Sequence, residues 1–213
     1  MRMERAHKRP INSILFICIH LTSTAQQPPF ASQMQNSTPE AHNDHCKFCF
    51  QSLLWHFAPQ KHPKPSLSIA HFSTALFITW KSTLTGELRG CIGTLKPQPL
   101  PLAQSLSQYA IHSATRDHRF APISPNELPN LQVTVSFLHT FEVCAQWNDW
   151  IVGVHGIEIE IQDSEAEVIT VKHATFLPSV PLEQHWGHRE TIRLFRIAGK
   201  DGWMDAANET VVY

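Results

Sequence analysis

Residues 131–137 read Leu-Gln-Val-Thr-Val-Ser-Phe, so apolar and polar side chains alternate along this stretch. Such a period of two is typical of a β-strand that buries one face and exposes the other. The same pattern returns at Ile157–Gln162, and the apolar run Val168–Thr175 follows after an acidic turn at Asp163–Glu167. The sequence therefore predicts strands here, with an antiparallel hairpin formed by the last two.

Further elements are predicted on both sides of these strands. Ala75–Trp80 and Glu87–Leu95 flank a polar break and indicate another hairpin, and Glu209–Tyr213 resembles the beginning of a strand. Apolar residues at three- and four-residue spacing predict three helices: Cys46–Phe57 with Asp44 as its N-cap, Leu102 to about Asp117, and Leu182–Ala198. Strands and helices do not alternate strictly, which favours an α+β fold with a mixed or antiparallel sheet and packed helices.

Composition places the chain among ordinary globular proteins. Of its 213 residues 42% are hydrophobic and 16% charged, which is enough for a core and argues against a membrane-spanning chain. The 17 Lys and Arg against 18 Asp and Glu leave no basic excess for nucleic acid. The odd number of cysteines, five, suggests free thiols in a reducing compartment, the cytoplasm, the nucleus or both.

The N-terminal residues 1–43 lack the apolar periodicity of a core element. We expect a disordered leader or a mis-called upstream extension there, and a single domain over residues 44–213. The alternative is a signal peptide in residues 1–25, because basic residues precede the apolar run Ile11–Leu21 and small residues follow it. In that case the protein is secreted.

The densest candidate site is the run Leu88-Arg89-Gly90-Cys91-Ile92-Gly93. Two glycines permit φ > 0 or close approach of the backbone, while Arg89 could hold an anion and activate Cys91 as a thiolate. The alternative is a bulged strand in which Cys91 belongs to the core. In an extended segment Arg89 and Cys91 share a face, so Arg89 could instead pair with Asp117 or a bound anion.

Two further segments supply candidate partners. Asp117 and Arg119 could orient a group near the cysteine, or could be ordinary charges at a helix end. His155 stands between glycines and could act as a general base for Cys91, or be a turn residue. Cys91 and His155 are thus the catalytic candidates, and neither is assigned that role.

Metal and cofactor motifs are weak. His42, His45, Cys46 and Cys49 are metal-ligand types at short spacing, but no second Cys-x-x-Cys pair exists to complete a zinc site. Nucleotide-binding loops and zinc-hydrolase motifs are also absent from the sequence. We therefore expect no metal and no cofactor.

The run Leu88–Gly93 resembles the signature of the AMMECR domain family. Other matching segments occur in the family's order: Cys46-x-x-Cys49-Phe50, Phe77–Trp80, Ser113-Ala114, Asp117-x-Arg119-Phe120-x-Pro122, Glu127–Pro129, Gly153–Ile157, Thr175–Pro178 and Glu183-Gln184. The resemblance covers essentially Cys46–Tyr213. The chain departs from the pattern at His185, where glycine is common before the tryptophan, and at Gly187, and the final strand and tail look cut off.

This resemblance implies an α+β protein with a main sheet and a smaller second lobe, and the signature near the cleft between them. It implies no established reaction. Prokaryotic relatives are associated with Memo-type and radical-SAM proteins, and eukaryotic relatives are regarded as intracellular regulators. We therefore expect a non-enzymatic regulatory or binding domain that uses Arg89, Gly90 and Cys91 for a small anionic ligand or a protein partner. The alternative is a thiol-dependent enzyme with Cys91 as nucleophile or redox thiol.

Overall fold

The computed structural model describes residues 13–23, 41–67, 72–163, 170–198 and 211–212. Its elements follow in the order β1 (Ser13–Ser23), α1 (Asn43–Phe57), β2 (Ala75–Ser82), β3 (Leu88–Thr94), α2 (Leu102–Thr115), the 3₁₀-helix η1 (Pro125–Asn130), β4 (Leu131–Val143), β5 (Gly156–Asp163), β6 (Thr170–Phe176), α3 (Ser179–Glu183), α4 (His188–Ala198) and β7 (Val211–Val212). The strands pair in the order β6-β5-β1-β4-β2-β3-β7. The predicted α+β class is confirmed. No helix among the described residues is long and apolar enough to cross a bilayer.

The chain divides into two compact units. The larger contains the described residues from Ile19 to Thr140 together with β7, and the smaller contains the first part of β1 and the described residues from Phe141 to Ala198. Each unit is built around a predicted hairpin, β2–β3 in the larger and β5–β6 in the smaller. Both hairpins are antiparallel, as the short connection between their consecutive strands requires.

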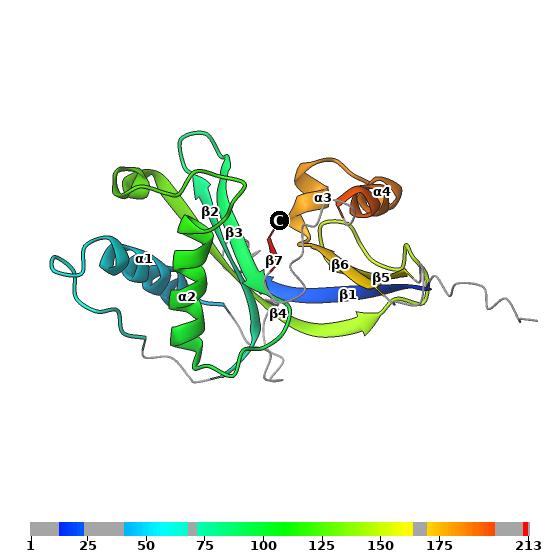
Figure 1. Cartoon of the computed structure of the whole chain (residues 1–213), viewed down its shortest axis with the longest axis horizontal. Helices are drawn as coiled ribbons and strands as arrows, with labels where there is room; N and C mark the ends of the chain where they lie inside the picture. Colours follow the sequence, from blue (N-terminus) through cyan, green and yellow to red (C-terminus); the bar gives the residue numbers. More distant parts are fainter. Residues whose placement is uncertain (1–12, 24–40, 68–71, 164–169, 199–210, 213) are drawn as a thin grey trace, which may run out of the picture. The chain divides into compact units, whose positions relative to one another are not determined.

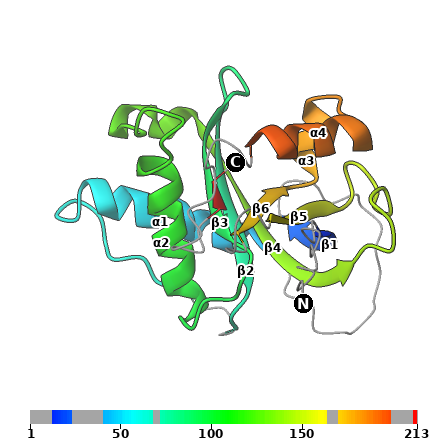
Figure 2. The ribbon, with the colours of Figure 1, turned by 45° about the vertical axis from the view of Figure 1, so that its right-hand side comes forward.

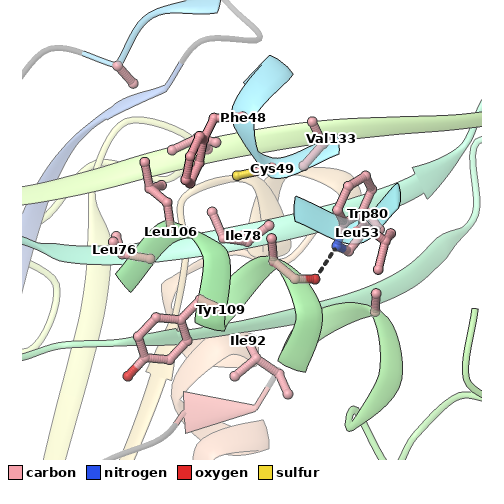
Figure 3. Close-up of a cluster of buried hydrophobic side chains, with 14 of the residues drawn as sticks. Phe48, Cys49, Leu53, Leu76, Ile78, Trp80, Ile92, Leu106, Tyr109 and Val133 are labelled. Atoms are coloured by element: carbon pink, nitrogen blue, oxygen red, sulfur yellow. Dashed lines mark hydrogen bonds between the residues drawn. The ribbon is translucent and has the colours of Figure 1, made fainter. Parts of the chain in front are cut away.

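In the larger unit, α1 and α2 cover the same face of the β2–β3–β4 sheet (Figures 1 and 2). Figure 3 shows the core between them, where Phe48 and Leu53 of α1 and Leu106 of α2 meet strand residues such as Ile78. Trp80 is fully buried, and its indole Nε1 donates to the Ala110 carbonyl at 3.1 Å. A buried indole needs such a partner, so this bond also fixes α2 on the sheet.

The β2–β3 hairpin is irregular at one position. Trp80 pairs with Gly90 and Lys81 pairs with Leu88, so Arg89 has no partner residue on β2. This extra residue is a bulge, as one of the two sequence interpretations expected. A bulge interrupts the strict alternation of faces at this position, so the face that Arg89 takes does not follow from the period of two alone.

The prediction of a disordered leader is wrong for Ser13–Ser23, which form β1 within the sheet. Cys18 is 5% exposed and Ile19 is fully buried, so this strand contributes to the core. β1 lies between β5 and β4, away from the edges of the sheet. Cys18 and Ile19 are consecutive and both are buried, so both faces of the strand are covered there, and polar residues are not needed at every second position.

Two predicted helix boundaries also change. His42, not Asp44, is the N-cap of α1, and Asp44 lies in the first turn, where it pairs with Lys47 at 2.8 Å. The single helix predicted over residues 182–198 is instead two helices, α3 and α4. The break between them falls at His185.

The break after α3 is a left-handed helix end. The N–H of Trp186 donates to the Pro181 carbonyl at 2.8 Å, the N–H of His185 donates to Leu182 at 3.2 Å, and His185 has φ of 57°. This pair of bonds is the Schellman arrangement, whose left-handed position glycine usually occupies. The resembled family commonly has glycine at this position. A histidine here places a side chain on a left-handed residue, so its backbone is strained.

Candidate functional site

At the Leu88–Gly93 signature, the backbone of β3 lies close to the backbone of α2. A Cβ atom placed on Gly90 would lie 1.8 Å from the Ser113 carbonyl oxygen, and one on Gly93 would lie 2.2 Å from the Leu76 carbonyl oxygen. Neither glycine has a positive φ, unlike Gly86 and Gly153. Both are therefore needed because the backbone has no room for a side chain, and not because of a left-handed conformation.

The close approach brings the end of α2 to Cys91. The Asp117 carboxylate accepts the Cys91 backbone N–H at 2.9 Å and two side-chain N–H groups of Arg119 at 2.6 and 2.9 Å. Arg119 also donates to the Cys91 carbonyl at 3.4 Å. Asp117 is only 4% exposed, so its charge requires this partner and these hydrogen bonds.

Arg89 is held by a different acid. Its Nε and Nη2 lie 2.9 and 2.8 Å from Glu127 Oε2, and Nη2 donates to the Ala121 carbonyl at 3.2 Å. The bond to Arg89 is the main cause that lowers the pKa of Glu127. Of the two partners considered for Arg89 from the sequence, Asp117 is wrong, because Arg119 occupies that carboxylate.

Glu127 was missed as a site residue. Its other oxygen accepts the Ser124 backbone N–H at 2.8 Å, which closes a capping box at the start of η1. The Ser-x-x-Glu spacing is a recognisable sequence signal for such a cap. That signal predicts only the cap, which uses Oε1 of Glu127. The ion pair with Arg89 uses Oε2.

The Cys91 thiol is directed away from solvent. The side chain is 4% exposed, and its Sγ lies 3.1 Å from the hydroxyl of Thr79, the residue opposite it on β2. Burial raises the pKa of Cys91 to about 11, although the Thr79 hydroxyl and Arg119 act in the opposite direction. The thiolate is the nucleophilic form, so this environment disfavours nucleophilic chemistry at neutral pH.

His155 belongs to the smaller unit, whereas Cys91 belongs to the larger. His155 ends the turn before β5, and its Nδ1 accepts the Ile151 backbone N–H at 3.1 Å. The same loop is anchored by Trp150, whose carbonyl accepts a hydrogen bond from His188 at 2.8 Å. The Nδ1 atom of His155 therefore stabilises the turn, as expected if this histidine is a turn residue.

The four residues considered as a metal set do not come together as one group among the described residues. His45 is fully buried and its Nδ1 accepts the His42 backbone N–H at 2.9 Å. Cys49 is also fully buried, and the Cys46 thiol donates to the Val133 carbonyl at 3.7 Å. These side chains pack α1 against the sheet. The five cysteines are all free thiols.

Comparisons with known proteins agree on one family. The family model AMMECR1 matches residues 46–213. An uncharacterized protein of Arabidopsis thaliana is 42% identical over 166 residues, covering 76% of this chain and 75% of that protein. An uncharacterized protein of Saccharomyces cerevisiae is 30% identical over 195 residues, with the same two coverages.

Among solved structures, an uncharacterized protein from Pyrococcus horikoshii is 20% identical, with a TM-score of 0.49 over 79% of this chain and 85% of that one. The family match extends from α1 to the C-terminal residue of the sequence and includes the whole Leu88–Gly93 signature together with Asp117 and Arg119. The chain therefore belongs to the AMMECR1 family.

Proposed function

We propose that this chain is a non-enzymatic binding or regulatory domain whose contact surface contains the guanidinium groups of Arg89 and Arg119. The ligand class that fits them is a carboxylate or phosphate, on a small molecule or on a partner's peptide. Memo-type and radical-SAM proteins are the first partners to test, and the cytoplasm and nucleus are the first compartments to examine.

The observation that carries this proposal is the contrast between Cys91 and the two arginines. Cys91 is buried with a raised pKa, so it lacks the exposed thiolate that a nucleophilic or redox enzyme needs. The side chains of Arg89 and Arg119 are 21% and 19% exposed. A site with an inert thiol and partly exposed guanidinium groups favours binding over thiol chemistry.

Both arginines also keep hydrogen-bonding capacity. Arg89 uses Nε and Nη2, and Arg119 uses Nε and Nη2 together with its backbone N–H. The Nη1 group of each donates to no acceptor among the described residues. Because their acids already fix Nε and Nη2, these Nη1 groups are held in place before a ligand arrives, which reduces the entropy lost on binding.

The test is a search for ligands and partners with purified protein, using inorganic phosphate, citrate and an acidic peptide as probes. The informative variant is Arg89→Gln with Glu127→Gln, which removes one guanidinium and one carboxylate and leaves the net charge unchanged. We expect weaker anion or partner binding in this variant. Arg116→Gln, at the exposed C-cap of α2, is the control for the loss of one guanidinium elsewhere on the surface.

Thiol reactivity distinguishes the enzyme alternative. We expect Cys91 to be alkylated more slowly than the partly exposed Cys46 and Cys144, with a midpoint near pH 11. Cys91→Ser identifies the signal in peptide mapping. A Cys91 midpoint more than about one unit below the free-thiol value of about 8.5 contradicts the binding proposal and supports a thiol enzyme. Binding that is equal in the parent and the double variant contradicts the role of Arg89.

A further inference from the structure

The outer edge of β3 is covered by two different kinds of group. Among the described residues, β7 pairs with β3 at Ile92 and Gly93, opposite Val212 and Val211. The next residue of β3 whose backbone N–H and C=O face this edge is Cys91. The described partners of its backbone N–H and C=O are the side chains of the ion pair formed by Asp117 and Arg119.

The directions of the backbone groups of Cys91 follow from its pairing with β2. Cys91 lies opposite Thr79, and their side-chain atoms are 3.1 Å apart, as expected for a pair that exchanges no backbone hydrogen bonds. Its N–H and C=O therefore both point away from β2, toward the outer edge. An added antiparallel strand would offer one acceptor and one donor at this place.

The ion pair supplies the same two groups. Asp117 Oδ2 accepts the Cys91 N–H at 2.9 Å, and Arg119 Nη2 donates to the Cys91 carbonyl at 3.4 Å. We infer that Asp117 and Arg119 form a side-chain cap that takes the place of a strand at Cys91 and prevents a second copy of this chain from adding a strand to β3. Unpaired edges are templates for such pairing, and charged side chains and bulges are common means of blocking them.

The bulge at Arg89 strengthens this interpretation. Arg89 stands between the paired positions Leu88 and Gly90, so the regular ladder of β3 is interrupted two residues before Cys91. A bulge increases the local twist and turns an edge away from an approaching strand. In the part of the chain that the structure describes, β7, the ion pair and the bulge thus occupy successive positions along β3.

Self-association is the direct test of this cap. Asp117→Ala removes the acceptor and leaves the outward N–H of Cys91 open to another chain. We expect the variant to self-associate about tenfold or more tightly than the parent when both are compared by sedimentation velocity over the same concentrations. We also expect the Cys91 amide to be protected from hydrogen exchange in the associated form and exposed in the dissociated form.

Two further variants keep the test informative if Asp117→Ala does not fold. Arg119→Met leaves Asp117 on the Cys91 N–H and frees the carbonyl, so we expect a smaller gain in association. Arg116→Met removes a cation from the same loop without uncovering β3, and should behave as the parent does. If Arg119→Met folds and matches Arg116→Met in both association and Cys91 amide exchange, the cap inference is overturned.

Discussion

Replacing Gly90 with alanine tests the close contact between β3 and α2 that holds the signature. The added Cβ would lie 1.8 Å from the Ser113 carbonyl oxygen, whereas Cβ atoms essentially never approach closer than 3.0 Å. Strand and helix must therefore separate by more than about 1 Å, a displacement that forfeits a large part of the dispersion energy at their interface. Neither side can relieve the clash by rotating a side chain, because the contact on the helix is backbone.

Overpacking of this kind costs about 3 kcal/mol or more, the upper part of the usual range. For a chain of this size that corresponds to a fall in melting temperature of about 6–12 °C. Thermal unfolding followed by circular dichroism measures it. Gly86 is the control: it has φ of 74° and no neighbour within 4 Å of an added Cβ.

At Gly86 we expect alanine to cost about 1 kcal/mol and asparagine only a few tenths, because asparagine tolerates the left-handed region. At Gly90 asparagine should be at least as harmful as alanine. If Gly90→Ala and Gly86→Ala lower the melting temperature equally, or if Gly90→Ala is neutral, the steric reasoning is refuted.

Three other predictions concern stability. Ile19→Ala should lower the free energy of unfolding by about 2–5 kcal/mol in urea titrations, because Ile19 is fully buried in β1; no loss would restore the disordered leader. His185→Gly should raise the free energy of unfolding by about 0.5–1 kcal/mol, since glycine adopts a φ of 57° without steric cost. A destabilised variant would contradict the idea that the backbone is strained at His185. Burial lowers the pKa of His45 from 6.5 to about 4, so within that window the unfolded chain binds a proton that the folded chain does not. Stability should therefore fall by up to about 3 kcal/mol as the pH falls through the window, and His45→Asn should flatten that dependence.

The sequence predicted the elements whose signals are local. Both hairpins and helices α1 and α2 follow from periods of two or of three to four residues, and the structure has them within a few positions. β1 was not predictable by the same means. An apolar run without alternation is equally typical of a central strand and of the apolar part of a signal peptide, and only its place between β4 and β5 decides.

The contacts around Cys91 were predicted only in part. One of the two interpretations of Asp117 and Arg119 placed them near Cys91, and the structure joins the three by hydrogen bonds, but Glu127 was missed. The sequence could not assign the partners, because the pairing of Arg89 with Glu127 spans 38 residues. The bulge at Arg89 adds to this, since a single extra residue changes which groups the side chain can reach and leaves no mark in the period of the strand.

Most of the signature is accounted for by the packing of one strand against one helix, and this bears on how its variants are to be interpreted. Substitution of Gly90, Cys91 or Asp117 changes a buried contact. A loss of function in such variants therefore combines the effects of unfolding and of lost binding. Arg89 and Arg119 differ because part of each side chain reaches solvent. Lysine at either position keeps the charge but cannot reproduce the planar, two-pronged contact of the guanidinium. Loss of ligand binding in Arg89→Lys with an unchanged melting temperature would therefore place Arg89 in the binding surface, whereas parallel loss of both would make it a structural residue like its neighbours.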